Sequence, residues 1–131
     1  MLLALDVGNT NICIGCIKGE EILFTGRLST DYSKTADEYA ISFNSIIRLY
    51  GYQAGDIDGS IISSVVPPLN QTLKDAVNRL TGTTPLLVGP GVKSGLNILL
   101  DNPAQTGSDL VVDAVAAIAQ YPKPLIIIDM G

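Results

Sequence analysis

A short apolar run near the start of the chain ends in a polar turn whose residue types suit an oxyanion ligand. The run Leu2–Val7 leads into Gly8-Asn9-Thr10-Asn11, and Asp6 stands at its end. Glycine lets the backbone approach an oxyanion closely, and the asparagines and threonine offer amide and hydroxyl donors. Asp6 can hold Mg²⁺ directly or through water, since Mg²⁺ usually takes one or two carboxylates and keeps several waters. The pattern indicates a nucleotide-phosphate site, and the alternative is an ordinary Asn/Gly-rich β-turn.

The same pattern recurs at the other end of the sequence. The apolar run 125–128 leads into Asp129-Met130-Gly131. Two such loops facing each other would clamp the triphosphate of ATP. No Gly-Lys-Ser/Thr follows the first loop, so a Walker A loop is excluded there. We expect residues 1–123 to form a first domain. Residues 124–131 are expected to supply the first strand and phosphate loop of a second, related domain.

A third candidate lies at Thr106-Gly107-Ser108-Asp109, where a helix is expected to begin. A carboxylate in a first helical turn is favoured by the positive end of the helix dipole. Asp109 in that position is suited to accept a proton from a substrate hydroxyl, as an aspartate does in kinases. The alternative is that this segment only caps the helix, through Thr106 or Ser108.

Composition narrows the chemistry that these residues can support. The chain has 131 residues, of which 13 are acidic and 8 basic, with two cysteines and no histidine. Zinc sites of the usual Cys/His kind and Ser-His or Cys-His pairs are therefore excluded, and the acidic balance argues against a nucleic-acid surface. No apolar run reaches the ~20 residues of a membrane-spanning helix. Cys13 and Cys16, three apart on an expected strand, should face opposite sides and remain reduced, as in a cytoplasmic protein.

The elements that position these residues follow from periodicity and turn signals. Apolar runs typical of strands lie at 2–7, 12–18, 21–28, 60–66, 86–88 and 125–128. Tight turns join the first three, which predicts an antiparallel meander. Thr35 and Glu38 have capping-box spacing before one helix, and Pro67-Pro68 opens another that Gly82 ends. The order β-β-β-α-β-α-β-α, followed by the run at 125–128, predicts an α/β domain with a mixed central sheet of the ribonuclease-H-like kind.

Together, these motifs resemble the N-terminal half of type III pantothenate kinases, in the acetate and sugar kinase/Hsp70/actin superfamily. The matching segments are Leu5-Asp6-Val7-Gly8-Asn9-Thr10-Asn11, Ser63-Ser64-Val65-Val66-Pro67, Gly89-Pro90-Gly91-Val92-Lys93-Ser94-Gly95-Leu96, Asp101-Asn102-Pro103, Gly107-Ser108-Asp109 and Asp129-Met130-Gly131. The resemblance implies an actin-like ATPase domain that phosphorylates pantothenate with ATP, the first step toward coenzyme A. It also implies a homodimer, beside the cytoplasmic location and the lack of nucleic-acid and membrane partners that composition predicts.

The resemblance further implies roles for individual positions. The first phosphate loop would comprise Asp6, Val7, Gly8, Asn9, Thr10, Asn11, Ile12 and Cys13, with Asp6 near Mg²⁺. The pantothenate side would comprise Leu100, Gly107, Ser108, Asp109 and Leu110, with Asp109 as general base. Asp129 would bind a monovalent cation, K⁺ or NH₄⁺.

Two positions depart from the family pattern. Leu110 stands where the family's Gly-x-Asp-Arg has arginine, and Leu100 stands where an aromatic residue is common before Asp-Asn-Pro. Both changes fall on the pantothenate side and favour a second hypothesis, a non-catalytic regulatory member comparable to the Bvg accessory factor. The intact Asp109 opposes it. A third hypothesis, an ATPase of the actin/Hsp70 type without a small-molecule acceptor, is opposed by the intact segments at 89–96 and 101–103.

Overall fold

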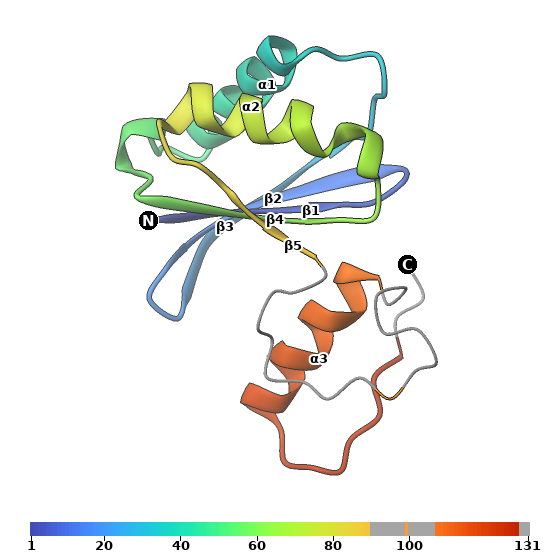
Figure 1. Cartoon of the computed structure of the whole chain (residues 1–131). Helices are drawn as coiled ribbons and strands as arrows, with labels where there is room; N and C mark the ends of the chain where they lie inside the picture. The colour runs from blue at the N-terminus through green and yellow to red at the C-terminus, as the bar shows by residue number, and fades with distance from the viewer. Residues whose placement is uncertain (90–98, 100–106, 129–131) are drawn as a thin grey trace.

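The fold is a five-stranded mixed sheet with helices on both sides (Figure 1). The structure is a computed structural model and describes residues 1–89, 99 and 107–128. Its elements in chain order are β1 (Leu2–Val7), β2 (Asn11–Lys18), β3 (Glu21–Ser29), α1 (Ala36–Leu49), β4 (Gly59–Ser64), α2 (Asn70–Thr81), β5 (Leu86–Val88) and α3 (Ser108–Gln120), with short 3₁₀ turns at Ala54–Asp56 and Pro67–Leu69.

The strands lie in the order β3-β2-β1-β4-β5. The pairs β1–β2 and β2–β3 are antiparallel, whereas β1–β4 and β4–β5 are parallel. The predicted meander is confirmed, and so is the predicted α/β class with a mixed sheet. An antiparallel meander extended by parallel strands, each reached through a helix, is the ribonuclease-H-like arrangement.

The hydrophobic core lies between the sheet and the pair α1 and α2, which cover the same face (Figure 1). Along each inner strand, alternate residues point into this core because successive side chains of a strand face opposite ways. The fully buried side chains include Leu3, Ile14 and Ile62 from the sheet, and Phe43 and Leu73 from the helices.

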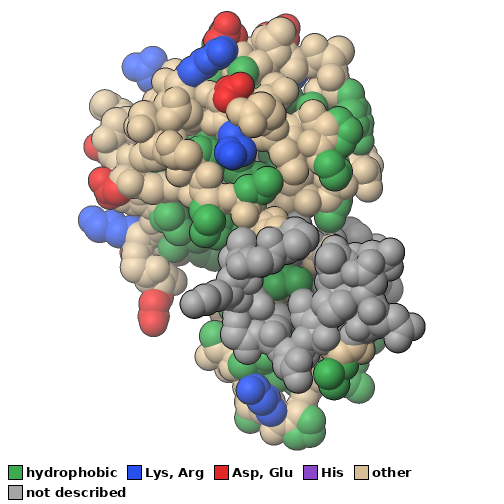
Figure 2. Space-filling model, viewed as in Figure 1, with side chains coloured by type: hydrophobic (Ala, Val, Ile, Leu, Met, Phe, Trp, Pro, Cys, Tyr) green, Lys and Arg blue, Asp and Glu red, His purple; other side chains and the backbone are tan. Residues whose placement is uncertain are grey.

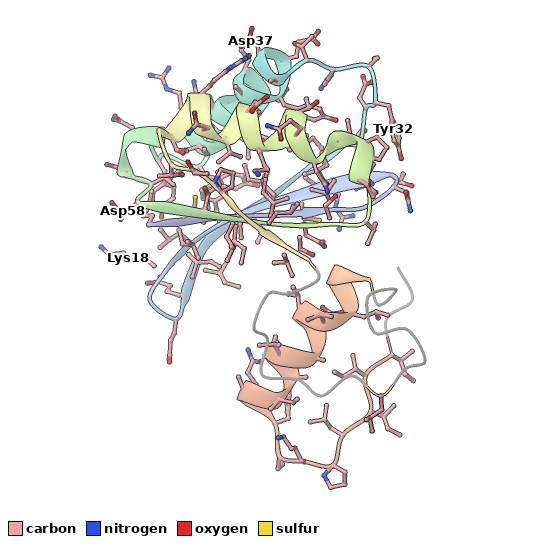
Figure 3. All side chains as sticks on the ribbon, viewed as in Figure 1. Lys18, Tyr32, Asp37 and Asp58 are labelled. Carbon is pink, nitrogen blue, oxygen red and sulfur yellow. The ribbon has the colours of Figure 1, made fainter. Side chains whose placement is uncertain are left out.

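At the surface, acidic and basic side chains are interspersed over the part of the molecule that contains α1 and α2 (Figure 2). One ion pair, Arg79 to Asp37 at 2.6 Å, joins the two helices on the outside (Figure 3). Both partners are largely exposed, so the pair contributes little to stability. Within the described ranges, no helix has the length and apolar character needed to cross a bilayer.

Local signals set the ends of α1 and α2. Thr35 accepts from the Glu38 amide at 3.3 Å, and Glu38 accepts from the Thr35 amide at 2.7 Å, which confirms the capping box. The helix α2 ends at Gly82, whose φ of 72° lies in the left-handed region that glycine tolerates best. For α3 the expected cap is wrong. The N-cap is Gly107, which has no side chain to offer, and Ser108 already lies inside the helix.

The expected strand at 125–128 is also wrong for this structure. These residues carry no strand assignment, none of the five strands pairs with them, and Ile126 and Ile128 are 90% and 80% exposed. Branched apolar residues favour a strand only where a neighbouring strand supplies hydrogen-bond partners and a packing surface. The division at residues 123 and 124 remains a prediction.

Candidate functional site

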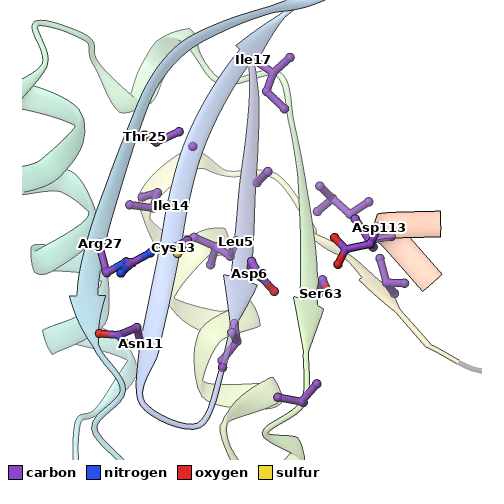
Figure 4. Close-up of a pocket in the computed structure, with 18 of the residues that line it drawn as sticks. Leu5, Asp6, Asn11, Cys13, Ile14, Ile17, Thr25, Arg27, Ser63 and Asp113 are labelled. Atoms are coloured by element: carbon purple, nitrogen blue, oxygen red, sulfur yellow. The ribbon is translucent and has the colours of Figure 1, made fainter. Parts of the chain in front are cut away.

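A cavity of about 850 Å³ lies on the sheet face that α1 and α2 leave uncovered. The strands β1 to β5, the turn between β1 and β2, and α3 all contribute to its lining (Figure 4). Since the side chains on this face alternate with those in the core, the cavity and the core are built from the same strands.

Four polar side chains cross the floor of the cavity in one row. In the sheet register Asp6 lies opposite Cys13 on one side and opposite Ser63 on the other, and Cys13 lies opposite Arg27. All four line the cavity, and the side chain of Arg27 extends from β3 toward Cys13 (Figure 4). The row therefore places a carboxylate, a thiol, a hydroxyl and a guanidinium on neighbouring strands. Among the described lining residues, Arg27 is the one cationic side chain.

The turn after β1 borders the cavity and has two amides that donate to no acceptor among the described residues. The Gly8 amide donates to the Asn11 carbonyl at 2.9 Å, which closes the turn. Asn9 and Thr10 are exposed, and their backbone amides donate to no group in the described part of the chain. A Cβ at Gly8 would lie 3.2 Å from the Asn11 carbonyl oxygen, so a larger residue here would require this carbonyl to shift by a few tenths of an ångström. The amides offered to a ligand are those of Asn9 and Thr10.

The predicted phosphate-loop residues separate into two groups. The side chains of Val7 and Ile12 are buried in the core, so these residues can meet a ligand only through their backbone. Cys13 lines the cavity and Cys16 is buried on the other side, and both are free thiols, as the strand pattern predicted. Burial raises the pKa of the Cys16 thiol.

The helix α3 brings a carboxylate to the cavity that the sequence analysis did not single out. Asp113 lines the cavity, and its carboxylate is directed toward the edge where Asp6 and Ser63 lie (Figure 4). The signal available in the sequence was its spacing of four residues from Asp109, one helical turn. Arg27 and Ser63 were also missed, because only the strand register shows that they share a row with Asp6.

The pantothenate-side predictions are located only in part. Gly107 is the N-cap of α3, and residues 108 and 109 form its first turn. Leu110 is 49% exposed. Leu100 and Asp129 lie outside the described residues.

The donor set of the cavity fits a magnesium ion bound together with phosphate. Asp6 and Asp113 supply carboxylates and Ser63 supplies a hydroxyl. Mg²⁺ is typically held by one or two carboxylates together with substrate phosphates and water, rather than by an all-protein cage. The described residues contain no group of three or more His, Cys, Asp or Glu side chains placed to hold a metal.

The sheet order and this cavity define the class: an α/β protein with a ribonuclease-H-like sheet and, at the end of β1, a cavity crossed by a row of polar side chains. The sequence then specifies the family. The profile described as type III pantothenate kinase matches residues 2–131, so the chain belongs to the type III pantothenate kinase family.

Two curated relatives are named type III pantothenate kinase. The chain is 46% identical to the one from Halalkalibacterium halodurans over 131 residues, which is 100% of this chain and 52% of the relative. It is 47% identical to the one from a Geobacillus species over 131 residues, which is 51% of that relative. The chain thus spans about half the length of the curated relatives it matches. Neither name supports the regulatory alternative.

Among solved structures, the chain is similar to RuvC from Thermus thermophilus. The TM-score is 0.45 at 12% sequence identity, with 94% of this chain and 84% of that chain covered.

Proposed function

We propose that this chain forms the N-terminal half of an ATP-dependent pantothenate kinase. The enzyme transfers the γ-phosphoryl group of ATP to the primary hydroxyl of pantothenate, giving 4′-phosphopantothenate for coenzyme A synthesis. The observation that carries this proposal is the 46% identity to a type III pantothenate kinase along the whole chain. The cavity at the end of β1 supports it, because its groups suit a nucleotide phosphate.

The phosphate side of the reaction is assigned to the turn after β1 and the polar row. The exposed amides of Asn9 and Thr10 donate to phosphate oxygens, and Arg27 offers a charge from β3. Asp6, with Asp113 and Ser63 nearby, would hold Mg²⁺. When bound, the ion neutralises charge on the β- and γ-phosphates. The protein's part is to fix the triphosphate in one orientation against the substrate.

The acceptor side is assigned to the first turn of α3. Residue 109 lies one helical turn before Asp113, whose carboxylate lines the cavity. A carboxylate in this turn is favoured in its ionised form by the helix dipole, as a general base must be. Asp109 takes the proton from the pantothenate hydroxyl as the oxygen attacks the γ-phosphorus, and the bond from this phosphorus to the bridging oxygen breaks to release ADP. Leu100, Gly107, Ser108 and Leu110 are proposed to line the pantothenate site.

Leucine at position 110 is the point where substrate recognition departs from the family pattern. Leucine donates no hydrogen bond, so a charge-assisted contact of ~1.5–3 kcal/mol is absent from this position. We expect Leu110→Arg to lower the KM for pantothenate and to leave the KM for ATP unchanged. An unchanged pantothenate KM would show that this position does not limit recognition.

The remaining parts of the proposal concern the whole protein. Because the curated relatives are about twice as long, a second domain is proposed to complete the ATP cleft, beginning with residues 124–131. Asp129 is proposed to bind K⁺ or NH₄⁺. The whole enzyme is proposed to be a cytoplasmic homodimer with no nucleic-acid or membrane partner.

The test is product formation by the full-length protein with ATP, Mg²⁺, K⁺ and pantothenate, followed by mass spectrometry. The expected product is 4′-phosphopantothenate, and it should be lost in Asp109→Asn. Asp75→Asn, on the exterior helix α2, is the matched control and should keep full activity. ATP binding without any product would contradict the kinase assignment.

A further inference from the structure

The turn after β1 is fixed by hydrogen bonds from one residue of a neighbouring chain segment. Thr30 follows directly after β3 and makes two hydrogen bonds to this turn. Its hydroxyl donates to the Gly8 carbonyl at 2.7 Å, and its amide donates to the Thr10 carbonyl at 2.8 Å. Both bonds link segments about twenty residues apart in sequence, so they are tertiary contacts and not part of the turn itself.

A hydrogen bond to a carbonyl of the turn also fixes the direction of the amide N–H in the same peptide unit. A peptide unit is planar and trans, so its N–H points opposite to its C=O. The Gly8 carbonyl shares a peptide unit with the Asn9 amide. A hydrogen bond that fixes the Gly8 carbonyl therefore also fixes where the Asn9 amide points. It also polarises the unit, which makes that amide a better donor.

Thr30 is fixed in turn by α1. The next residue, Asp31, donates its amide to the Tyr39 hydroxyl at 2.9 Å, and that hydroxyl donates to the Asp31 carbonyl at 2.7 Å. Tyr39 is fully buried in the core and stacks on Phe43 at a centroid distance of 5.7 Å. A chain of hydrogen bonds thus runs from a rigid core residue to the turn at the cavity.

We propose that Thr30 is a positioning residue for phosphate binding: its hydroxyl orients the Asn9 amide toward the nucleotide, and Tyr39 secures Thr30 through Asp31. The proposal rests on the proposed function of the turn as a phosphate loop. Thr30 touches no substrate in this account. It acts through the Gly8–Asn9 peptide group.

The test compares Thr30→Val with Thr30→Ser in the full-length protein. Valine keeps the branched shape and loses the hydroxyl, whereas serine keeps the hydroxyl. For Thr30→Val we expect the KM and Kd for ATP to rise by about three- to tenfold, the effect of losing one neutral hydrogen bond. The KM for pantothenate should not change, and Thr30→Ser should restore ATP binding to within about twofold of the wild type.

A matched control is Thr81→Val in α2. The Thr81 hydroxyl also donates to a backbone carbonyl, that of Val77 at 2.9 Å, but this carbonyl belongs to α2 and not to the turn after β1. This variant should lose some stability and keep its ATP affinity. Tyr39→Phe keeps the stacked ring and removes the hydroxyl, and it should weaken ATP binding less than Thr30→Val.

Amide hydrogen exchange separates this proposal from the proposed function. Without nucleotide, Thr30→Val should exchange faster than the wild type at residues 8–11 and equally at α2. Wild-type ATP affinity in Thr30→Val would overturn the positioning role and leave the kinase assignment standing. A wild-type protein that binds no ATP would overturn the phosphate loop itself. Exchange at residues 8–11 would then still report whether Thr30 orders the turn.

Discussion

The two faces of the sheet are made by the same strands but have different roles: one packs against helices and the other lines a cavity. On the covered face, Leu5, Ile14 and Ile62 pack against α1 and α2 and are almost completely buried. On the open face, their neighbours Asp6 and Cys13 line a cavity with groups that can bind a charged ligand. Adjacent residues on one strand are thus divided between packing and chemistry.

This division means that one substitution should disturb one face and spare the other. The covered face stabilises the fold through buried apolar area, and its residues have little contact with a ligand. The open face has few buried apolar side chains, so its polar residues can change with little effect on folding. The predictions below test whether the two faces are independent, starting from the largest expected effect.

The largest effect is expected from a core deletion in α1. Phe43 is fully buried, so Phe43→Ala should lower the free energy of unfolding by about 3–5 kcal/mol, measured by urea denaturation. Ile41, on the same helix, is 67% exposed, and Ile41→Ala should change stability by less than about 0.5 kcal/mol. Equal losses in both variants would show that the buried face does not carry the stability.

On the open face, Asp6→Asn should strongly reduce activity without unfolding the protein. Removing the carboxylate that would hold Mg²⁺ should reduce kcat/KM by about 100-fold or more, a loss near 2.7 kcal/mol. The urea midpoint should stay close to that of the wild type. Asp37→Asn, which breaks an exposed ion pair between α1 and α2, is the control and should keep its activity.

A smaller effect is expected from Arg27→Gln, which removes the cation of the polar row. The KM for ATP should rise about tenfold or more, since a hydrogen bond to a charged group contributes about 1.5–3 kcal/mol, and this rise should weaken at high salt. Arg48 lies in the last turn of α1, away from the cavity, and Arg48→Gln should not change the KM. A salt-independent KM in the wild type would contradict a charge contact from Arg27.

The smallest expected effect is on the pH dependence of stability, and it comes from Asp31, the residue after Thr30. Hydrogen bonds from the Ser33 hydroxyl and amide, at 2.6 and 2.8 Å, hold the pKa of Asp31 below its usual value. Because the folded pKa is the lower one, the ionised form stabilises the fold above the usual pKa of about 3.9. That contribution is lost as the pH falls through the folded pKa.

Thermal unfolding between pH 6 and 3 measures this contribution. Asp31→Asn and Ser33→Ala should each show a shallower fall in Tm toward low pH than the wild type. Since Asp31 is close to the surface, the difference should be slight. Identical pH profiles in all three proteins would show that this turn does not depend on the carboxylate.

Local sequence signals were sufficient to predict much of the fold. The turns of the meander, the Thr35 capping box and the glycine that ends α2 depend on residues within a few positions of each other, and all are confirmed. Asp6 and the following turn were also recognisable, because the polar residues directly follow an apolar run.

Contacts between residues distant in sequence could not be predicted from such local signals. Arg27 and Ser63 join Asp6 only through the register of three strands, and Asp113 joins it only through the placement of α3. The run at 125–128 has the composition of a strand, but a strand also needs a neighbour, which composition does not provide. At the start of α3, side-chain type favoured Thr106 or Ser108 as the cap, whereas the N-cap is Gly107, which makes no side-chain hydrogen bond.

The opposite orientations of Cys13 and Cys16 give the protein two natural reporters on one strand. Cys13 is beside the cavity and open to a small alkylating reagent, whereas Cys16 is sealed in the core with its pKa raised by burial. A labelling time course followed by mass spectrometry should therefore show a fast and a slow phase. Ligand in the cavity would retard the first phase, and only opening of the sheet would release the second. Occupancy and unfolding can thus be timed in one sample of the unmodified protein.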